Sequence, residues 1–213
     1  AVNSIMYYAP TILQNTGMST NAALFATIAN GVVSVIMVMI GIALLGYIGR
    51  RTMAALGQIG CTCCLFLLAA ISAFMPEHIG ADVNLLRCYL ILGSMLLFLC
   101  FMQGCYSPVI WLMLSEMFPA KIRGICMGGA VCSLWCSNVL IAMFFPVLLS
   151  SLGLALTFSI YGLIGIAGSI FVLKFIPETR HRSLEQIEHY LRSKYDEEAH
   201  MKKLRTVREV EEI

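Results

Sequence analysis

We predict an all-α integral membrane protein in which a bundle of apolar helices precedes a charged tail. Hydrophobic residues make up 59% of the 213-residue chain and charged residues only 12%, whereas a soluble domain usually has about 25% charged residues. The charges are also unevenly distributed, since 8 of the 14 Lys and Arg and 9 of the 12 Asp and Glu lie in the last 37 residues. We therefore expect the body of the chain to lie in lipid and its end to lie in water.

Apolar runs that are nearly free of charge define the expected membrane spans, because a helix that crosses the hydrocarbon core needs about 20 apolar residues. The expected spans are 1–14, 22–46, 53–75, 87–117, 124–149 and 154–176. The first covers only about 21 Å at 1.5 Å per residue, so we expect it to be the remaining part of a longer span. The chain begins at Ala1 with no basic segment before an apolar core, and we expect a fragment without a signal peptide.

Basic residues mark one side of the membrane. The connections that follow the second and fourth expected spans carry Arg50 with Arg51 and Lys121 with Arg123. Further Lys and Arg follow in the tail, whereas the alternate connections are uncharged or acidic. By the positive-inside rule, we expect the basic connections and the carboxy-terminus to be cytoplasmic in a multi-pass protein.

The segment 177–213 predicts a cytoplasmic tail with an amphipathic helix over 183–195. Ser183 and Gln186 form a capping box at the start of this helix. Its apolar stripe consists of Leu184, Ile187, Leu191 and Tyr195. We expect this stripe to lie against the cytoplasmic ends of the transmembrane bundle, 1–176.

Small residues predict close contacts between helices. Gly162, Gly165 and Gly168 recur at every third position, and Gly124 with Gly128 forms a GxxxG pair. Such residues let helix backbones approach closely in lipid. We expect them to serve packing within the bundle rather than a dimer interface.

The nine cysteines are odd in number and lie within apolar stretches. We therefore expect them to pack as small apolar side chains rather than to form a disulfide framework. Cys61 and Cys64 form a CxxC pair, but no imidazole or carboxylate lies close to them in sequence. Neither a metal site nor a redox site is predicted from this pair.

A polar face interrupts the expected span 87–117. Gln103, Ser107 and Trp111 are spaced four residues apart and share one helical face, beside a helix-breaking Pro108. Non-helical backbone inside a membrane is tolerated where it is buried or lines a cavity, which favours a substrate path. Because Trp111 also lies near the end of the span, the residues alone leave two interpretations open, a cavity-facing ring and an interfacial belt residue.

Two further pairs combine an aromatic ring with an amide on one helical face. Trp135 and Asn138 lie near the middle of a span, and Asn3 with Tyr7 lies in the first one. Amides and flat rings suit a polyhydroxylated ligand, because they offer hydrogen bonds and a stacking surface. No nucleophile has a base near it in sequence, so we predict neither an enzyme nor a cofactor site.

Four motifs resemble the sugar porter branch of the major facilitator superfamily, in that family's order and spacing. They are NSIMYYAPTIL at 3–13, GRR at 49–51, PVIWLMLSEMFPAKIRG at 108–124 and PETRHRSLEQI at 177–187. Over residues 1 to about 195, the chain is similar to the carboxy-terminal six-helix half of a major facilitator fold. This resemblance implies a transporter of a plasma membrane or bacterial inner membrane, which binds a solute between two halves and exposes it to each side in turn.

The resemblance also implies roles for individual residues. The implied substrate-binding residues are Asn3, Tyr7, Gln103, Trp111, Trp135 and Asn138. The implied gating residues are Tyr8, Pro108, Arg51, Glu116, Arg123 and Glu178. The charged members of the second set correspond to a cytoplasmic network that holds the two halves together. For Trp111 the resemblance favours stacking on the substrate over a place in the interfacial belt.

The implied partners are a sugar or polyol-like substrate, membrane lipid and a missing amino-terminal six-helix half. In proton-coupled members of the family, a proton is the coupling ion of symport. The resemblance implies no cofactor, no metal and no nucleic acid.

Some positions depart from the family's pattern. Leu134 stands where a sugar-bonding amide is usual, Ser34 stands where some members have Asn, and Gly46 and Tyr47 replace an acidic residue and an Arg. These departures leave the substrate class undetermined. The alternatives are a hexose, a polyol and a less hydroxylated, non-sugar metabolite. An alternative function is a non-transporting membrane scaffold whose tail binds a partner, although the polar face around Trp135 argues against it.

Overall fold

The computed structural model describes residues 20–76, 78–79, 82–116, 118 and 122–176. Outside them lie the expected span 1–14, the expected tail helix 183–195 and the site candidates Asn3, Tyr7, Tyr8 and Glu178. The described chain is helical apart from one short hairpin, which confirms the predicted all-α fold class.

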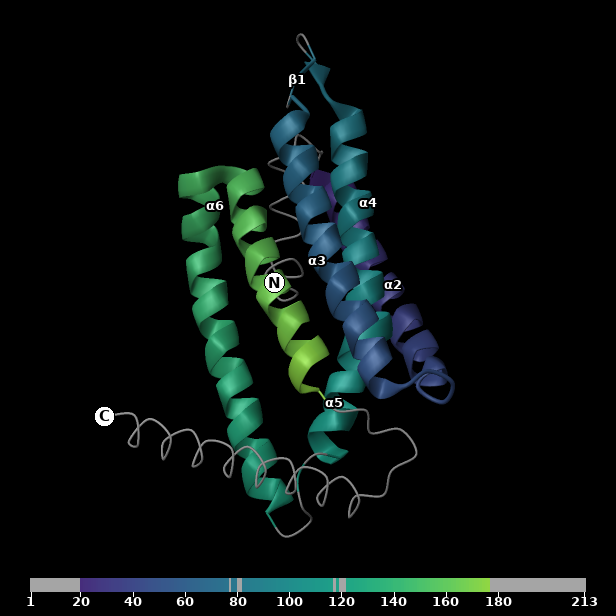
Figure 1. Cartoon of the computed structure of the whole chain (residues 1–213). Coiled ribbons are helices and arrows are strands. Elements are labelled where there is room, and N and C mark those ends of the chain that lie inside the picture. The colour runs from purple at the N-terminus through teal and green to yellow at the C-terminus, as the bar shows by residue number, and fades with distance from the viewer. Residues whose placement is uncertain (1–19, 77, 80–81, 117, 119–121, 177–213) are drawn as a thin grey trace, which may run out of the picture.

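Five helices and a π-helical turn make up the described fold (Figure 1). The helices are α2 (Thr20–Leu44), α3 (Arg50–Phe74), α4 (Leu85–Phe101), α5 (Ser107–Glu116) and α6 (Arg123–Phe175), and the π-helical turn η1 (Met102–Tyr106) joins α4 to α5. Strands β1 (His78–Ile79) and β2 (Asp82–Val83) form an antiparallel hairpin between α3 and α4. α3 lies between α4 and α6, and α2 packs against α4 and η1.

Gly153 divides α6 into a first limb, 123–152, and a second limb, 154–175. Its φ of 73° with ψ of 177° is a conformation that residues with a side chain rarely adopt. A straight helix of 53 residues would measure about 80 Å, far more than the roughly 30 Å of a hydrocarbon core. Figure 1 shows that the bend instead sets the two limbs side by side.

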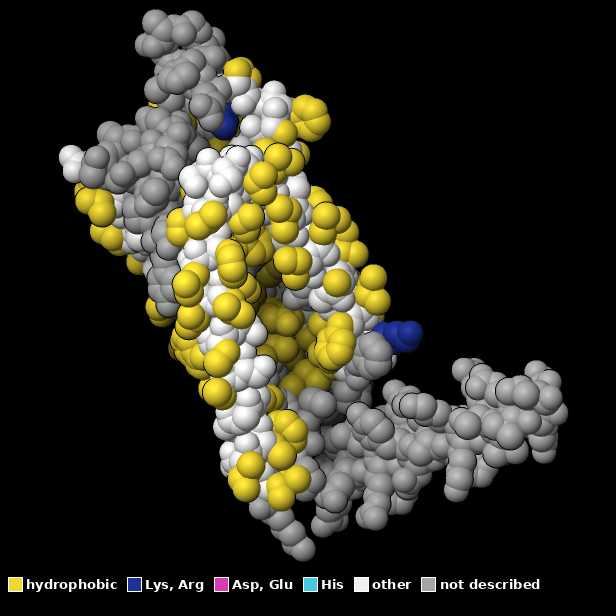
Figure 2. Space-filling view, turned by 90° about the vertical axis from the view of Figure 1, so that its left-hand side faces the viewer, with side chains coloured by type: hydrophobic (Ala, Val, Ile, Leu, Met, Phe, Trp, Pro, Cys, Tyr) yellow, Lys and Arg dark blue, Asp and Glu magenta, His cyan; other side chains and the backbone are white. Residues whose placement is uncertain are grey.

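Four helical stretches are long and apolar enough to cross a membrane. They are Thr27–Leu44, Arg50–Phe74, Leu85–Glu116 and Arg123–Lys174, the last of which contains both limbs of α6. Figure 2 shows hydrophobic side chains spread over the outer surface of the described helices, with few charges among them. A surface of this kind suits lipid and not water, so the fold is that of an integral membrane protein.

Small residues on the second limb of α6 pack against α3. A Cβ built on Gly165 would lie 2.7 Å from Oγ1 of Thr62, and one built on Gly168 would lie 2.8 Å from Nε2 of Gln58. The same Gln58 Nε2 donates a hydrogen bond of 3.2 Å to the carbonyl oxygen of Gly165. The predicted packing role of these glycines is therefore confirmed, whereas a Cβ on Gly124 would meet nothing within 4 Å.

The apolar core lies between α3, α4 and the part of α6 around its bend. Phe145 on the first limb packs edge-on against Phe158 on the second limb, with 6.1 Å between ring centroids and 66° between ring planes. Both rings are fully buried. Cys61 and Cys64 are buried in the same cluster, as expected for cysteines that pack as small apolar side chains. These contacts fix the two limbs to α3 near Gly153.

Candidate functional site

Pro108 breaks the membrane helix between α4 and α5. A proline has no N–H to donate to the carbonyl four residues earlier, which is that of Gly104, and its ring crowds that carbonyl. The backbone widens into η1, where the N–H of Ser107 donates to the carbonyl oxygen of Met102, five residues earlier. Such single π-helical turns occur inside α-helices frequently at functional sites.

Two glycines on neighbouring helices allow the backbone of those helices to pack directly against this break. A Cβ built on Gly41 of α2 would lie 2.2 Å from the carbonyl oxygen of Gly104 and 3.0 Å from the ring of Pro108. On α3, a Cβ built on Gly57 would lie 2.8 Å from the backbone nitrogen of Tyr106. The irregular backbone is thus enclosed by protein on two sides, as hydrocarbon surroundings require.

Four of the predicted substrate-binding residues lie on two separate elements. Gln103 lies in η1 and is partly buried, and Trp111 lies on α5 with 47% of its surface exposed. Trp135, which is 51% exposed, and the partly buried Asn138 lie on the first limb of α6. At these exposed fractions, both tryptophan rings keep open surface for a further contact.

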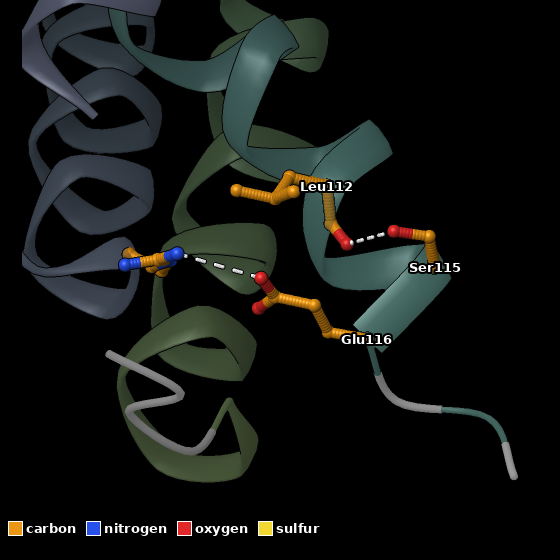
Figure 3. Close-up of polar contacts among 4 residues, drawn as sticks. Leu112, Ser115 and Glu116 are labelled. Carbon is orange, nitrogen blue, oxygen red and sulfur yellow. Dashed lines mark hydrogen bonds and ion pairs between the residues drawn. The ribbon is translucent and has the colours of Figure 1, made fainter. Parts of the chain in front are cut away.

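An ion pair closes the end of the bundle at which α3 begins and α5 ends. Nη2 of Arg50 lies 3.4 Å from Oε1 of Glu116, and the two side chains are 22% and 21% exposed. Beside it, the Ser115 hydroxyl donates a hydrogen bond of 2.7 Å to the carbonyl oxygen of Leu112 (Figure 3). The predicted gating carboxylate is thus held by the first residue of α3.

The two predicted gating arginines, Arg51 and Arg123, bind backbone carbonyls. Arg51 donates from Nη2 to the carbonyl oxygen of Leu173 near the end of α6. Arg123 donates from Nε to the carbonyl oxygen of Phe118 over 3.5 Å. The sequence analysis placed Arg51 in the charge network and did not name Arg50. Arg50 could have been considered as well, because it is the other arginine of the GRR motif.

A cavity that sequence reasoning missed lies among α3, α4, η1 and α6. Its volume is about 280 Å³, and its polar lining groups are Gln58, Thr62, Tyr106 and Tyr161. None of the predicted site residues is among the described residues that line it. The available signal was Gln58, an amide within the apolar stretch of α3.

The described groups suit ligand binding through amides, hydroxyls and aromatic rings. No cluster of three or more His, Cys, Asp or Glu that could hold a metal ion occurs in the part of the chain that the structure describes. The open tryptophan faces and the amides of Gln103 and Asn138 are the groups that a neutral, hydroxylated molecule would use.

Comparison with known families and curated proteins gives consistent matches. The sequence matches the family described as "Sugar (and other) transporter" over residues 1–191. It is 46% identical over 195 residues to the major myo-inositol transporter IolT of Bacillus subtilis, covering 92% of this chain and 40% of that protein. It is 33% identical to a D-xylose transporter of Levilactobacillus brevis, covering 92% of this chain and 42% of that protein. The chain therefore spans about two fifths of the length of these curated relatives.

Solved structures show the same fold. The proton:xylose symporter XylE bound to 6-bromo-6-deoxy-D-glucose superposes with a TM-score of 0.75 at 29% identity, over 89% of this chain and 39% of that one. The inward-open conformation of XylE from E. coli gives a TM-score of 0.69 at 26% identity, over 89% and 42% of the two chains.

Proposed function

The chain belongs to the sugar (and other) transporter family, and on that premise we propose that it forms one six-helix half of a membrane carrier for a small hydroxylated metabolite. A second half completes the binding site, and the two halves rock to expose the substrate to each side of the membrane in turn. The observation that carries this proposal is the broken membrane helix α4–η1–α5, with Gln103 in the break and Trp111 beyond it.

The break supports a transport path because a regular helix satisfies its own backbone hydrogen bonds in lipid, whereas a broken helix does not. A break in that backbone is retained only where surrounding protein or a cavity satisfies it. Gln103 offers a carbonyl acceptor and two N–H donors, and Trp111 offers a ring that is about half open. Trp135 and Asn138 offer the same two kinds of group on the first limb of α6, so we assign all four to the substrate site.

A polyol or a monosaccharide is the substrate class that we propose. IolT is named for myo-inositol and the Levilactobacillus relative for D-xylose, both of which carry several hydroxyls. XylE is named as a proton:xylose symporter, which supports a proton as the coupling ion. The match to transporters also argues against the alternative of a non-transporting scaffold.

We assign the charged end of the bundle to the cytoplasmic gate. Arg51, Glu116 and Arg123 lie there, and Glu178 follows outside the described residues. The Arg50–Glu116 pair holds α5 to α3 within this half, so that movement against the second half carries α5 and α3 together. Pro108, near the start of α5, would then be the position at which α5 bends relative to α4.

A chimera tests the proposed function. The segment of IolT that aligns with this chain is replaced by the chain, and uptake of labelled myo-inositol is measured in cells that otherwise take up none. We expect saturable uptake by the chimera, at a rate above that of cells with an empty vector. Uptake equal to the empty vector, for a chimera that is present in the membrane, would overturn the proposal.

Trp111→Ala in the chimera tests the site. We expect a KM about tenfold higher than that of the unmodified chimera, because a stacking surface for the substrate is lost. Phe25→Ala is the matched control, since Phe25 is also an exposed aromatic residue but lies on α2 and was not assigned to the substrate site. Equal KM values for Trp111→Ala and Phe25→Ala would contradict the assignment.

A further inference from the structure

Asn30 is a buried amide near the middle of α2. Its residue surface is only 4% exposed, and both polar atoms of its side chain are inaccessible. Among the residues that the structure describes, neither Oδ1 nor Nδ2 has a hydrogen-bond partner. Asn30 was not among the site residues predicted from the sequence.

A buried amide without hydrogen bonds destabilises the folded protein, so the presence of Asn30 at this position needs a physical explanation. Burial of an amide without hydrogen bonds is costly in any apolar environment. In the hydrocarbon region water offers no replacement partner. A leucine has nearly the same shape and would avoid the loss, so the side chain fits a role in another state of the protein better than a role in packing.

The neighbouring polar residue does not satisfy this amide. Ser34, one turn further along α2, donates its hydroxyl to the backbone carbonyl oxygen of Asn30 at 2.8 Å. That bond uses the backbone of Asn30 and leaves its side chain unaffected. Ser34 is therefore accommodated by its own helix, as serines in membrane helices commonly are.

Asn30 lies on the face of α2 that packs along the broken helix. Positions 30, 34, 37 and 41 share one helical face. On this face, Met37 and Gly41 contact the break: a Cβ on Gly104 would lie 2.7 Å from Cε of Met37, and a Cβ on Gly41 would lie 2.2 Å from the carbonyl oxygen of Gly104. Asn30 precedes these contacts on the same face by about two turns, so a displacement of the broken helix away from α2 would open the face on which the Asn30 amide lies.

We propose that Asn30 is a substrate-binding residue that hydrogen-bonds two adjacent hydroxyls of a polyol or sugar when the broken helix moves away from α2. An amide has one acceptor oxygen and two N–H donors, and neighbouring hydroxyls each donate and accept, so the two groups match. The interrupted ladder at η1 and Pro108 is where this helix moves most readily. This inference rests on the proposed transport function and adds a specificity residue to it.

Asn30→Leu in the IolT chimera tests this inference. Three quantities are measured for the purified and membrane-embedded protein: the melting temperature, the KM for myo-inositol, and the competition by analogues that each lack one hydroxyl. We expect an unchanged or higher melting temperature, because an unsatisfied amide is removed, together with a KM about tenfold higher. We also expect reduced discrimination against one of the deoxy analogues, which a purely structural residue would not affect.

Thr157→Val is the matched control. Thr157 is fully buried, and its hydroxyl donates at 2.7 Å to the carbonyl oxygen of Gly153 on its own helix. We expect its KM and its analogue profile to equal those of the unmodified chimera. If Asn30→Leu reaches the membrane poorly, the smaller Asn30→Ser is measured by the same criteria.

The outcomes separate this inference from the proposed function. A KM and an analogue profile within about twofold of the unmodified chimera for the Asn30 variant would overturn the role of Asn30. If Trp111→Ala impairs transport in the same experiments, the proposed function stands without Asn30. Absence of uptake by the unmodified chimera would overturn both.

Discussion

Two adjacent arginines at the start of α3 bind different helices. Arg50 pairs with Glu116 at the end of α5, whereas Arg51 donates to the carbonyl oxygen of Leu173 on α6. Successive residues on a helix point about 100° apart, so neighbours in sequence face different elements. One turn of α3 therefore ties together the ends of three membrane helices.

A double-mutant cycle on Arg50→Gln and Glu116→Gln tests the first of these contacts. The pair is only about one fifth exposed, so we expect a coupling free energy of about 1 kcal/mol in thermal unfolding. The cycle of Glu116→Gln with Arg123→Gln is the control, because Arg123 donates to a backbone carbonyl. A larger coupling to Arg123 than to Arg50 would refute the pairing.

Individual site residues differ in how well sequence predicts them. The break at Pro108 was predictable, because a proline removes a hydrogen bond wherever the helix lies. The choice between Arg50 and Arg51 as partner of Glu116 was not, since it depends on how α3 is rotated in the bundle. The unsatisfied state of Asn30 likewise appears only when the residues around its side chain are known. For Trp111 and Asn138, sequence located the elements, and their role in the site stays a prediction.

At the scale of elements, α2 and the broken helix approach each other closely at Gly41. Gly41 faces the carbonyl oxygen of Gly104, the group that a residue with an N–H at position 108 would engage in a regular helix. No side chain fits between the backbones of α2 and η1 at this point. The position of α2 against the break therefore depends on position 41 being a glycine.

Gly41→Ala tests this contact. Its Cβ would lie 2.2 Å from a backbone oxygen that cannot move without the helix, so we expect a loss of about 1–3 kcal/mol in the free energy of unfolding. Gly31→Ala on the same helix is the control, because its Cβ would meet nothing within 4 Å. Melting curves of the two chimera variants give the comparison, and equal midpoints would show that the approach is looser than described.

The bounds of the helices were largely predictable, whereas the form of the bend at Gly153 and the π-helical turn η1 were not. The described helices lie within a few residues of the expected spans, because hydropathy and length together define a membrane crossing. The connection between the last two expected spans, SSLG, contains the bend at Gly153, but the tight form of this bend could not be predicted from the sequence. The π-helical form of η1 also depends on tertiary contacts, since glycines on α2 and α3 allow it.

At the scale of the whole molecule, the first limb of α6 has large exposed apolar and aromatic surface. Trp135, Leu140 and Met143 are each about half exposed or more. The curated relatives are longer than the chain, which covers only 40% of IolT. An open limb and a longer relative together favour a second half that covers this limb in the working carrier.

Reconstitution of the 213-residue chain alone tests this dependence. We expect liposomes that contain the chain to show no saturable uptake of myo-inositol, whereas liposomes that contain the IolT chimera do. Circular dichroism of the same samples checks that the chain is helical in both. Saturable uptake by the chain alone, competed by unlabelled myo-inositol, would show that it needs no second half.

The bend at Gly153 also decides where the two ends of α6 lie relative to each other. Because the bend reverses the course of the chain, the second limb ends toward the end of the bundle at which the first limb begins (Figure 1). A β-branched residue at this position disfavours a φ of 73°. A continuous helix of 53 residues would place its two ends about 80 Å apart. The backbone of a single glycine thus brings both ends of α6 to the same end of the bundle.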